Sequence, residues 1–127
     1  EHNIYSLLNG SNQGLKIFYE DATLKAVFTD GTASETATFT QTSFGGWDNV
    51  VVQRDPNVGL SIYVNGTLAE TATHNATIVP FSASTNAATF SEGTNSQYNP
   101  WFALSQFAFY NRFLSTTEIA LLNTQLT

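Results

Sequence analysis

Few residues of this 127-residue chain have the types and spacings that catalysis requires. Glu20 and Asp21 are adjacent, so in a strand their carboxylates would point to opposite faces and could not form the pair that glycoside hydrolysis needs. The two histidines, His2 and His74, are too few for a His-based metal site, and His74 is expected to be solvent-exposed and without a role. No G-x-S-x-G motif and no glycine-rich phosphate loop occurs. The sequence predicts that the protein is not an enzyme.

Four aspartates are candidate ligands for a hard cation such as calcium. Each falls at a predicted turn, where carboxylate and carbonyl oxygens come together. Asp also favours turns for its own local hydrogen bonds, and no D-x-D-x-D loop occurs, so a turn role is the preferred interpretation for any one of them. Calcium is the only cofactor that the sequence leaves open. The four residues are Asp21, Asp30, Asp48 and Asp55.

The segment 92–101 has the composition of a sugar-binding loop. Sugar recognition sets an aromatic ring against the apolar side of a pyranose and uses planar amides to fix the hydroxyl groups. Tyr98, Asn95 and Asn99 are the preferred candidates. Trp101 is a further candidate, although its place directly before a predicted buried strand favours a role in anchoring the loop. Trp47 is expected in the core.

Three N-x-[S/T] sequons lie in predicted loops, at Asn9, Asn65 and Asn75, where a glycan would be tolerated. In a chain this rich in Asn and Thr such sequons arise by chance, and a bacterial or phage source would leave them bare. Chance is the preferred interpretation.

Composition and charge exclude several classes of partner. Charged residues make up only 11%, and ten acids against four bases give a formal net charge of -6. The bases are scattered, which excludes nucleic acid and disfavours anionic membranes. No apolar run approaches the roughly 20 residues that span a bilayer, so no membrane insertion is expected. There is no cysteine, so neither disulfides nor thiolate metal sites contribute, and the uncharged polar surface is typical of domains outside the cytoplasm.

Short apolar segments separated by turn residues predict an all-β fold, an antiparallel β-sandwich or jelly roll. Asn65-Gly66 between two such segments is the strongest hairpin signal. Near the C-terminus, Ser115 and Glu118 form a capping box, and apolar residues then recur at helical spacing, which predicts one short helix over 115–123. The whole chain, 1–127, is expected to form a single domain. Strands are predicted at 15–19, 24–29, 36–40, 50–52, 60–64, 67–69, 78–79, 87–90 and 102–110.

Two stretches carry a resemblance to a known family: GWDNVVV at 46–52 followed by GLSIYVNG at 59–66, and LSQFAFYNRFLS at 104–115 followed by Glu118. Together they resemble the laminin-G-like, or concanavalin A-like lectin/glucanase, jelly-roll superfamily. The resemblance implies the sandwich fold, and calcium at its rim. Ser105 and Gln106 stand where the family often has paired acids, and the E-x-D-x-x-E pattern of the related glucanases is absent.

The resemblance also implies that the domain lacks its first strand or strands, which neighbouring domains or subunits would complete. It favours a non-catalytic carbohydrate-binding or adhesion module, displayed on an extracellular or virion surface as part of a larger protein. The alternative is a structural or protein-interaction domain, such as a virus or phage fibre or decoration component. The expected partner is accordingly a glycan or a surface protein.

Overall fold

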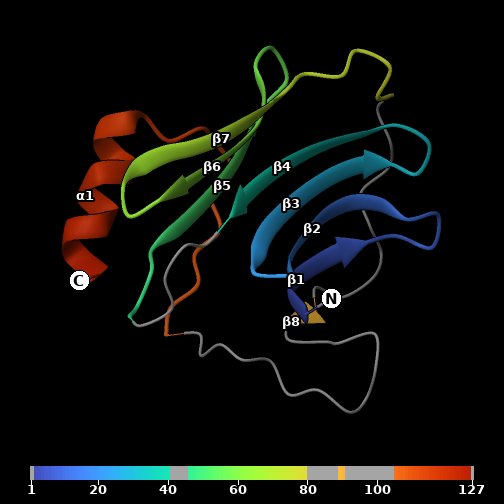
Figure 1. Cartoon of the computed structure of the whole chain (residues 1–127). Coiled ribbons are helices and arrows are strands. Elements are labelled where there is room, and N and C mark those ends of the chain that lie inside the picture. The colour runs from blue at the N-terminus through green and yellow to red at the C-terminus, as the bar shows by residue number, and fades with distance from the viewer. Residues whose placement is uncertain (1, 41–45, 80–88, 91–104, 127) are drawn as a thin grey trace.

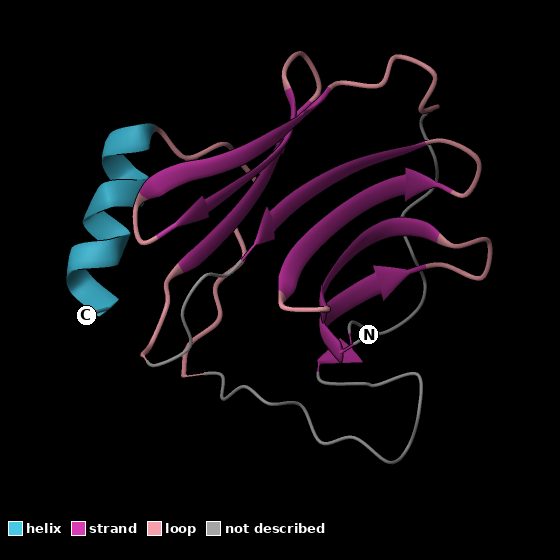
Figure 2. Ribbon diagram, in the orientation of Figure 1, coloured by secondary structure: helices cyan, strands magenta, loops and turns pink. Residues whose placement is uncertain are grey.

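The computed structural model describes residues 2–40, 46–79, 89–90 and 105–126. Within them the strands form two antiparallel sheets, and one helix follows (Figures 1 and 2). The first sheet has the order β4-β3-β2-β1-β8 and the second β5-β6-β7, as an antiparallel sandwich requires. The elements are β1 His2–Leu8, β2 Gln13–Glu20, β3 Thr23–Asp30, β4 Ser34–Thr40, β5 Val50–Asp55, β6 Gly59–Val64, β7 Thr67–Thr73, β8 Thr89–Phe90 and α1 Thr116–Leu126.

The core lies between β3 and β4 of the first sheet and β6 of the second. Leu24, Ala26, Ala37, Leu60 and Ile62 are completely buried there and pack together. Within β3 and within β6 the core residues are two positions apart, because alternate side chains of a strand share one face. The predicted β-sandwich is therefore confirmed.

The turn between β6 and β7 shows why Asn-Gly is a hairpin signal. Asn65 and Gly66 have φ values of 51° and 80°, and a two-residue turn that matches the twist of its strands requires positive φ at both positions. Gly66 also lets the turn approach the helix, since a Cβ at this residue would stand 3.4 Å from Cα of Ala120. The predicted hairpin is confirmed.

Helix α1 lies on the side of the second sheet that faces away from the first (Figure 1). Its N-terminus has the predicted capping box: the N–H of Glu118 donates to Oγ of Ser115 at 3.3 Å, and the N–H of Ser115 donates to Oε2 of Glu118 at 2.8 Å. The helix runs three residues beyond the predicted end at 123. Its residue Ile119 is completely buried. Among the described residues no helix is long and apolar enough to cross a membrane.

Two of the predicted strands are wrong where the structure describes them. Residues 78–79 form no strand, whereas residues 89–90 of the predicted 87–90 strand form β8 and its first two residues lie outside the described residues. Of 102–110, residues 105–110 form no strand and are exposed, although the ring of Phe107 stacks on that of Tyr5 with centroids 5.4 Å apart. Their side chains do not alternate between apolar and polar, so nothing in the pattern specifies a register.

Trp47 was expected in the core, and that prediction is wrong, since 65% of it is exposed. It lies in the irregular segment before β5, where no strand geometry directs a side chain inward. Val52, two residues into β5, packs against the core from this part of the chain instead.

Candidate functional site

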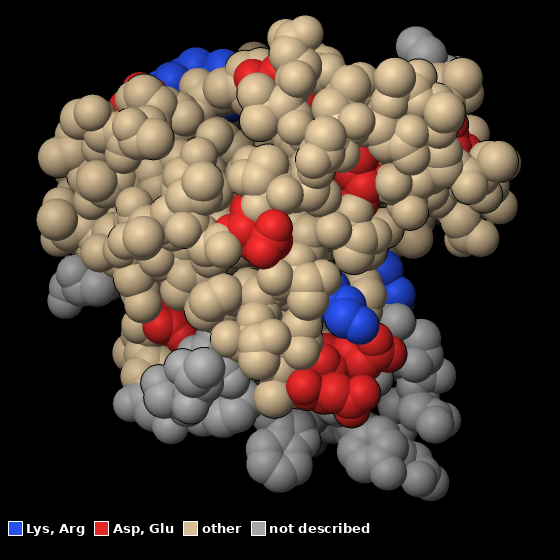
Figure 3. Space-filling view, turned by 45° about the horizontal axis from the view of Figure 1, so that its top comes forward, with Lys and Arg blue, Asp and Glu red and all other residues tan. Residues whose placement is uncertain are grey.

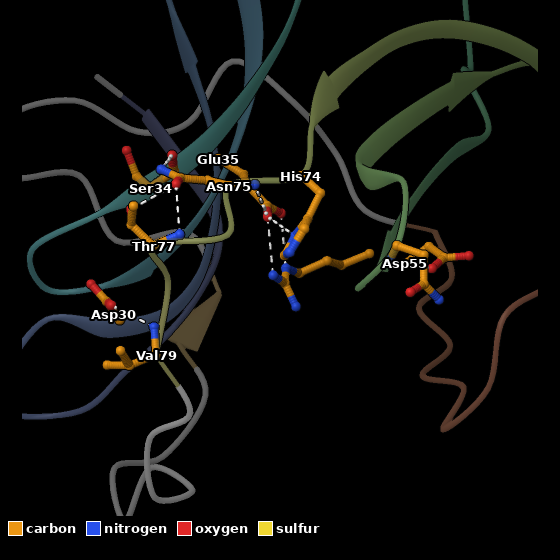
Figure 4. Close-up of polar contacts among 10 residues, drawn as sticks. Asp30, Ser34, Glu35, Asp55, His74, Asn75, Thr77 and Val79 are labelled. Carbon is orange, nitrogen blue, oxygen red and sulfur yellow. Dashed lines mark hydrogen bonds and ion pairs between the residues drawn. The ribbon is translucent and has the colours of Figure 1, made fainter.

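A buried carboxylate, Glu35 on β4, lies where the two sheets meet (Figure 4). Its side chain is fully buried, and Arg54 of β5 contacts it with two nitrogens, Nε to Oε2 at 2.8 Å and Nη2 to Oε1 at 3.0 Å. Directly after β7, His74 places Nδ1 3.0 Å from Oε1, and the N–H of Asn75 donates to the same oxygen at 2.9 Å. These partners come from the second sheet and the loop that follows it.

The surroundings of Glu35 keep it ionised. Burial acts to raise its pKa, but the hydrogen bonds from Arg54, from the N–H of Asn75 and from His74 outweigh burial and hold the pKa below its ordinary value. Arg54 is fixed further by the ring of Phe28, whose centroid lies 4.1 Å from the guanidinium carbon. A buried, ionised carboxylate cannot protonate a leaving group, so Glu35 is unsuited to acid catalysis. Its contacts instead join the two sheets.

His74 is therefore not the solvent-exposed residue without a role that its polar neighbours suggested. Less than a third of its side chain is exposed, and its ring contacts a carboxylate 39 positions earlier in the chain. That separation explains the error, because nothing close in the sequence marks the partner.

Asp30, one of the four candidate calcium ligands, is buried at the end of β3. Its Oδ1 accepts the N–H groups of Thr32 and Ala33 at 2.9 and 2.7 Å, and its Oδ2 accepts that of Val79 at 2.9 Å. The backbone hydrogen bonds, that of Ala33 foremost, hold the pKa of Asp30 below its ordinary value. Both oxygens thus organise the β3–β4 turn and attach the loop after β7, which matches the turn role preferred from the sequence.

These two acids make stability depend on pH. Their folded pKa values lie below the ordinary values of 4.5 for Glu35 and 3.8 for Asp30, so below those values the unfolded chain binds protons first. The contribution of these two carboxylates to the free energy of unfolding is expected to be complete above pH 4.5. It should be lost as the pH drops through their folded pKa values. Urea denaturation at pH 7, 5, 4 and 3 measures this, and Glu35→Gln should show a smaller decline. An equal decline in that variant would contradict the assignment.

Of the other three candidate calcium ligands, Asp21 and Asp55 lie at turns and Asp48 lies in the irregular segment before β5. Oδ1 of Asp55 accepts the N–H of Asn57 at 2.7 Å between β5 and β6, and Oδ1 of Asp48 accepts Nδ2 of Asn65 at 2.8 Å. Asp21 forms the β2–β3 turn with φ 48°. In the described part of the chain, no three residues among His, Cys, Asp and Glu come together in a way that could hold a metal ion. Calcium stays a prediction.

The three sequon asparagines each have a structural role. Oδ1 of Asn9 accepts the N–H of Gln13 at 3.0 Å, that of Asn65 accepts the N–H of Asn49 at 2.9 Å, and that of Asn75 accepts the N–H of Thr77 at 3.0 Å. Turn formation is sufficient reason for an Asn at these positions. Their glycosylation is left as a prediction.

The four residues predicted to bind sugar, Tyr98, Asn95, Asn99 and Trp101, lie outside the described residues. That prediction is therefore untested.

A hollow of about 230 Å³ lies between the segment 110–114 and α1, and we name it the helix pocket. Tyr110, 44% exposed, is the aromatic residue among those that line it. The polar side chains in the pocket are an amide, Gln125, and an ion pair in which Nη2 of Arg112 lies 2.7 Å from Oε1 of Glu118. The lining residues are Tyr110, Arg112, Leu114, Glu118, Leu121, Leu122 and Gln125.

The ion pair of the helix pocket is reinforced by further hydrogen bonds. Besides Nη2, Nη1 of Arg112 donates to Oε2 of Glu118 at 3.1 Å and to the carbonyl of Phe113 at 3.1 Å. The hydrogen bond from Arg112, with those from Ser115, lowers the pKa of Glu118 to about 2. The pair is thus charged but neutral overall, and the other lining residues are a tyrosine, three leucines and a glutamine.

Sequence reasoning missed both the Glu35 cluster and the helix pocket. One signal existed for Glu35: it alternates with Ala37 and Phe39 on β4, so an acid occupies the core-facing set and must have a partner. For the pocket, Arg112 and Glu118 stood inside the stretch used for the family resemblance, but their pairing depends on how the chain turns into α1.

No curated protein and no solved structure matches the chain. A family model described as the Concanavalin A-like lectin/glucanases superfamily matches residues 1–120. The two packed antiparallel sheets agree with that match. The chain therefore belongs to the concanavalin A-like lectin/glucanase superfamily.

Proposed function

We propose that this domain is a non-catalytic carbohydrate-binding module and that one sugar ring sits in the helix pocket. The observation that carries the proposal is that the pocket's lining combines an aromatic residue, Tyr110, with an amide and an ion pair. An aromatic face takes the apolar side of a pyranose, while planar polar groups take its hydroxyls. At about 230 Å³ the hollow is smaller than the roughly 300–1,000 Å³ that encloses a drug-sized ligand, which suits a single ring of a longer glycan.

The chemistry of the pocket supports binding without hydrolysis. Glycosidases need two carboxyl groups, one of which is protonated to act as an acid. Glu118 is the one carboxylate among the lining residues, and with a pKa of about 2 it carries no proton to donate near neutral pH. Although the superfamily includes glucanases, the pocket of this chain is therefore suited to binding a sugar and not to hydrolysing it.

The surface supports a module that works outside the cell, on an extracellular or virion surface. Uncharged side chains predominate on the face shown in Figure 3. Uncharged polar groups hydrogen-bond sugar hydroxyls without the cost of removing a charge from water.

Replacing Tyr110 by Ala is expected to weaken glycan binding about tenfold, because one aromatic stacking contact contributes about 1 kcal/mol and its buried surface adds to that. A glycan array identifies the ligand, with and without calcium, and titration calorimetry measures the affinity. Phe109→Ala is the matched control, since Phe109 is 69% exposed and does not line the pocket. Unchanged affinity in Tyr110→Ala, or no glycan retained on the array, would overturn the proposal.

A second candidate, a protein-interaction domain, is favoured by a different observation. Phe107, Phe109 and Phe113 are all exposed in the segment before α1. Exposed aromatic residues close together are typical of protein contacts. Under this alternative, Phe109→Ala would weaken assembly with a protein partner, and Tyr110→Ala would not be the more damaging change.

A further inference from the structure

We infer that the helix pocket selects neutral glycans and rejects acidic ones, because Glu118 already occupies the one guanidinium that could receive a sugar carboxylate. This selectivity rests on the proposed carbohydrate-binding function. It names the class of ligand, which neither the fold nor the superfamily specifies.

Arg112 is the only basic residue that lines the pocket. Arginine recognises a carboxylate with two parallel N–H···O bonds, and Glu118 takes both of these, at 2.7 Å from Nη2 and 3.1 Å from Nη1. A uronic or sialic acid would have to displace Glu118 in order to use the same fork. Otherwise the sugar carboxylate would lie beside that of Glu118, and the two negative charges would repel each other.

Glu118 is also held in place from the helix side. Its Oε2 accepts the N–H of Ser115 at 2.8 Å and the hydroxyl of Ser115 at 2.9 Å, as part of the capping box. Displacing it would therefore disrupt the N-terminus of α1 as well as the ion pair. The competition favours the intramolecular carboxylate, which is already positioned.

The other Lys and Arg side chains are each already in contact with a carboxylate or an aromatic ring. The chain has four basic residues, all within the described part, and a net charge of -6. Lys25 pairs with Glu20 at 2.6 Å and Arg54 with Glu35, while Nζ of Lys16 lies 4.7 Å from the centroid of the Phe18 ring. The electrostatic field of the domain therefore repels an anionic glycan instead of attracting it.

The experiment compares neutral with acidic glycans: N-acetyllactosamine with its sialylated form, and fully methyl-esterified polygalacturonate with the free acid, which share one backbone. The wild-type protein should bind the neutral members and hold the acidic ones at least about tenfold more weakly. Glu118→Gln frees the guanidinium while leaving a capping box, because Gln serves at that position as Glu does. The ratio of acidic to neutral binding should then rise at least about tenfold over the wild-type ratio.

Glu70→Gln is the control for net charge, because Glu70 is exposed on β7 and does not line the pocket. It should leave the preference as in the wild type, and an equal gain for acidic glycans in this variant would overturn the inference. Arg112→Gln should keep acidic binding low, since no fork remains, and far-UV circular dichroism checks that α1 is intact. Wild-type binding of acidic members as strong as of neutral ones overturns the selectivity alone. Binding of neither kind overturns the proposed function itself.

Discussion

Replacing Glu35 by Ala is expected to lower the free energy of unfolding by about 3 kcal/mol, the lower end of the range for breaking a buried ion pair. Arg54 would be left without its carboxylate while only 21% of its side chain is exposed. The N–H of Asn75 and the ring of His74 would lose the same acceptor. One substitution thus removes the side-chain hydrogen bonds of Glu35 to β5 and to the loop after β7.

Urea denaturation at pH 7 measures this loss. Glu20→Ala is the matched control, because Glu20 also pairs with a base, Lys25, but both side chains are partly exposed. An exposed pair contributes at most about 1 kcal/mol, so the control should be nearly as stable as the wild type. Equal effects in Glu35→Ala and Glu20→Ala would contradict a structural role for the Glu35 cluster.

Replacing Gly59 by Ala is expected to destabilise the fold by about 3 kcal/mol or more. Gly59 opens β6 with φ 122°, a conformation that costs an L residue about 1–3 kcal/mol. A Cβ there would also run into the carbonyl oxygen of Ala72 and lie 2.6 Å from the backbone nitrogen of His74. Both obstacles are backbone atoms of β7 and of the residue that follows it, so the β6–β7 pairing would have to shift, at about 1–3 kcal/mol more.

Gly10→Ala is the control for the glycine substitution. No atom lies within 4 Å of a Cβ built at Gly10, and its φ is not in the strained region. Its stability should stay within about 0.5 kcal/mol of the wild type or rise slightly, since Ala restricts the unfolded chain. Thermal unfolding followed by circular dichroism compares the two variants. A Gly59→Ala protein as stable as Gly10→Ala would show that β6 and β7 are not as closely paired as described.

Local signals account for what could be predicted of the fold. The strands from β2 to β7 follow from short apolar segments between turn residues, and the β6–β7 hairpin follows from Asn65 and Gly66. The helix N-terminus follows from Ser115 and Glu118. Each of these features depends on residues only a few positions apart, so a short stretch of sequence is enough to predict it.

The candidate sites could be predicted only in small part. The turn roles of Asp30 and Asp55 were expected, because Asp side chains bond to nearby backbone. The partners of Glu35 lie 19 and 39 positions away, and no local pattern connects them. Similarly, residue type alone does not predict that Trp47 and Phe109 are exposed, since aromatic residues are usually assigned to a core.

The sequence by itself determined the sandwich class, the hairpin turns and the capped helix, because neighbouring residues set backbone conformation and the alternation of faces. Only the tertiary structure decided that Glu35 joins the sheets, that His74 has a partner and that Arg112 and Glu118 border a pocket with Tyr110. Those features exist only once strands distant in sequence pack and α1 lies on its sheet. Packing brings such residues within hydrogen-bond distance. It therefore determines which charged groups pair and which side chains are buried at each site.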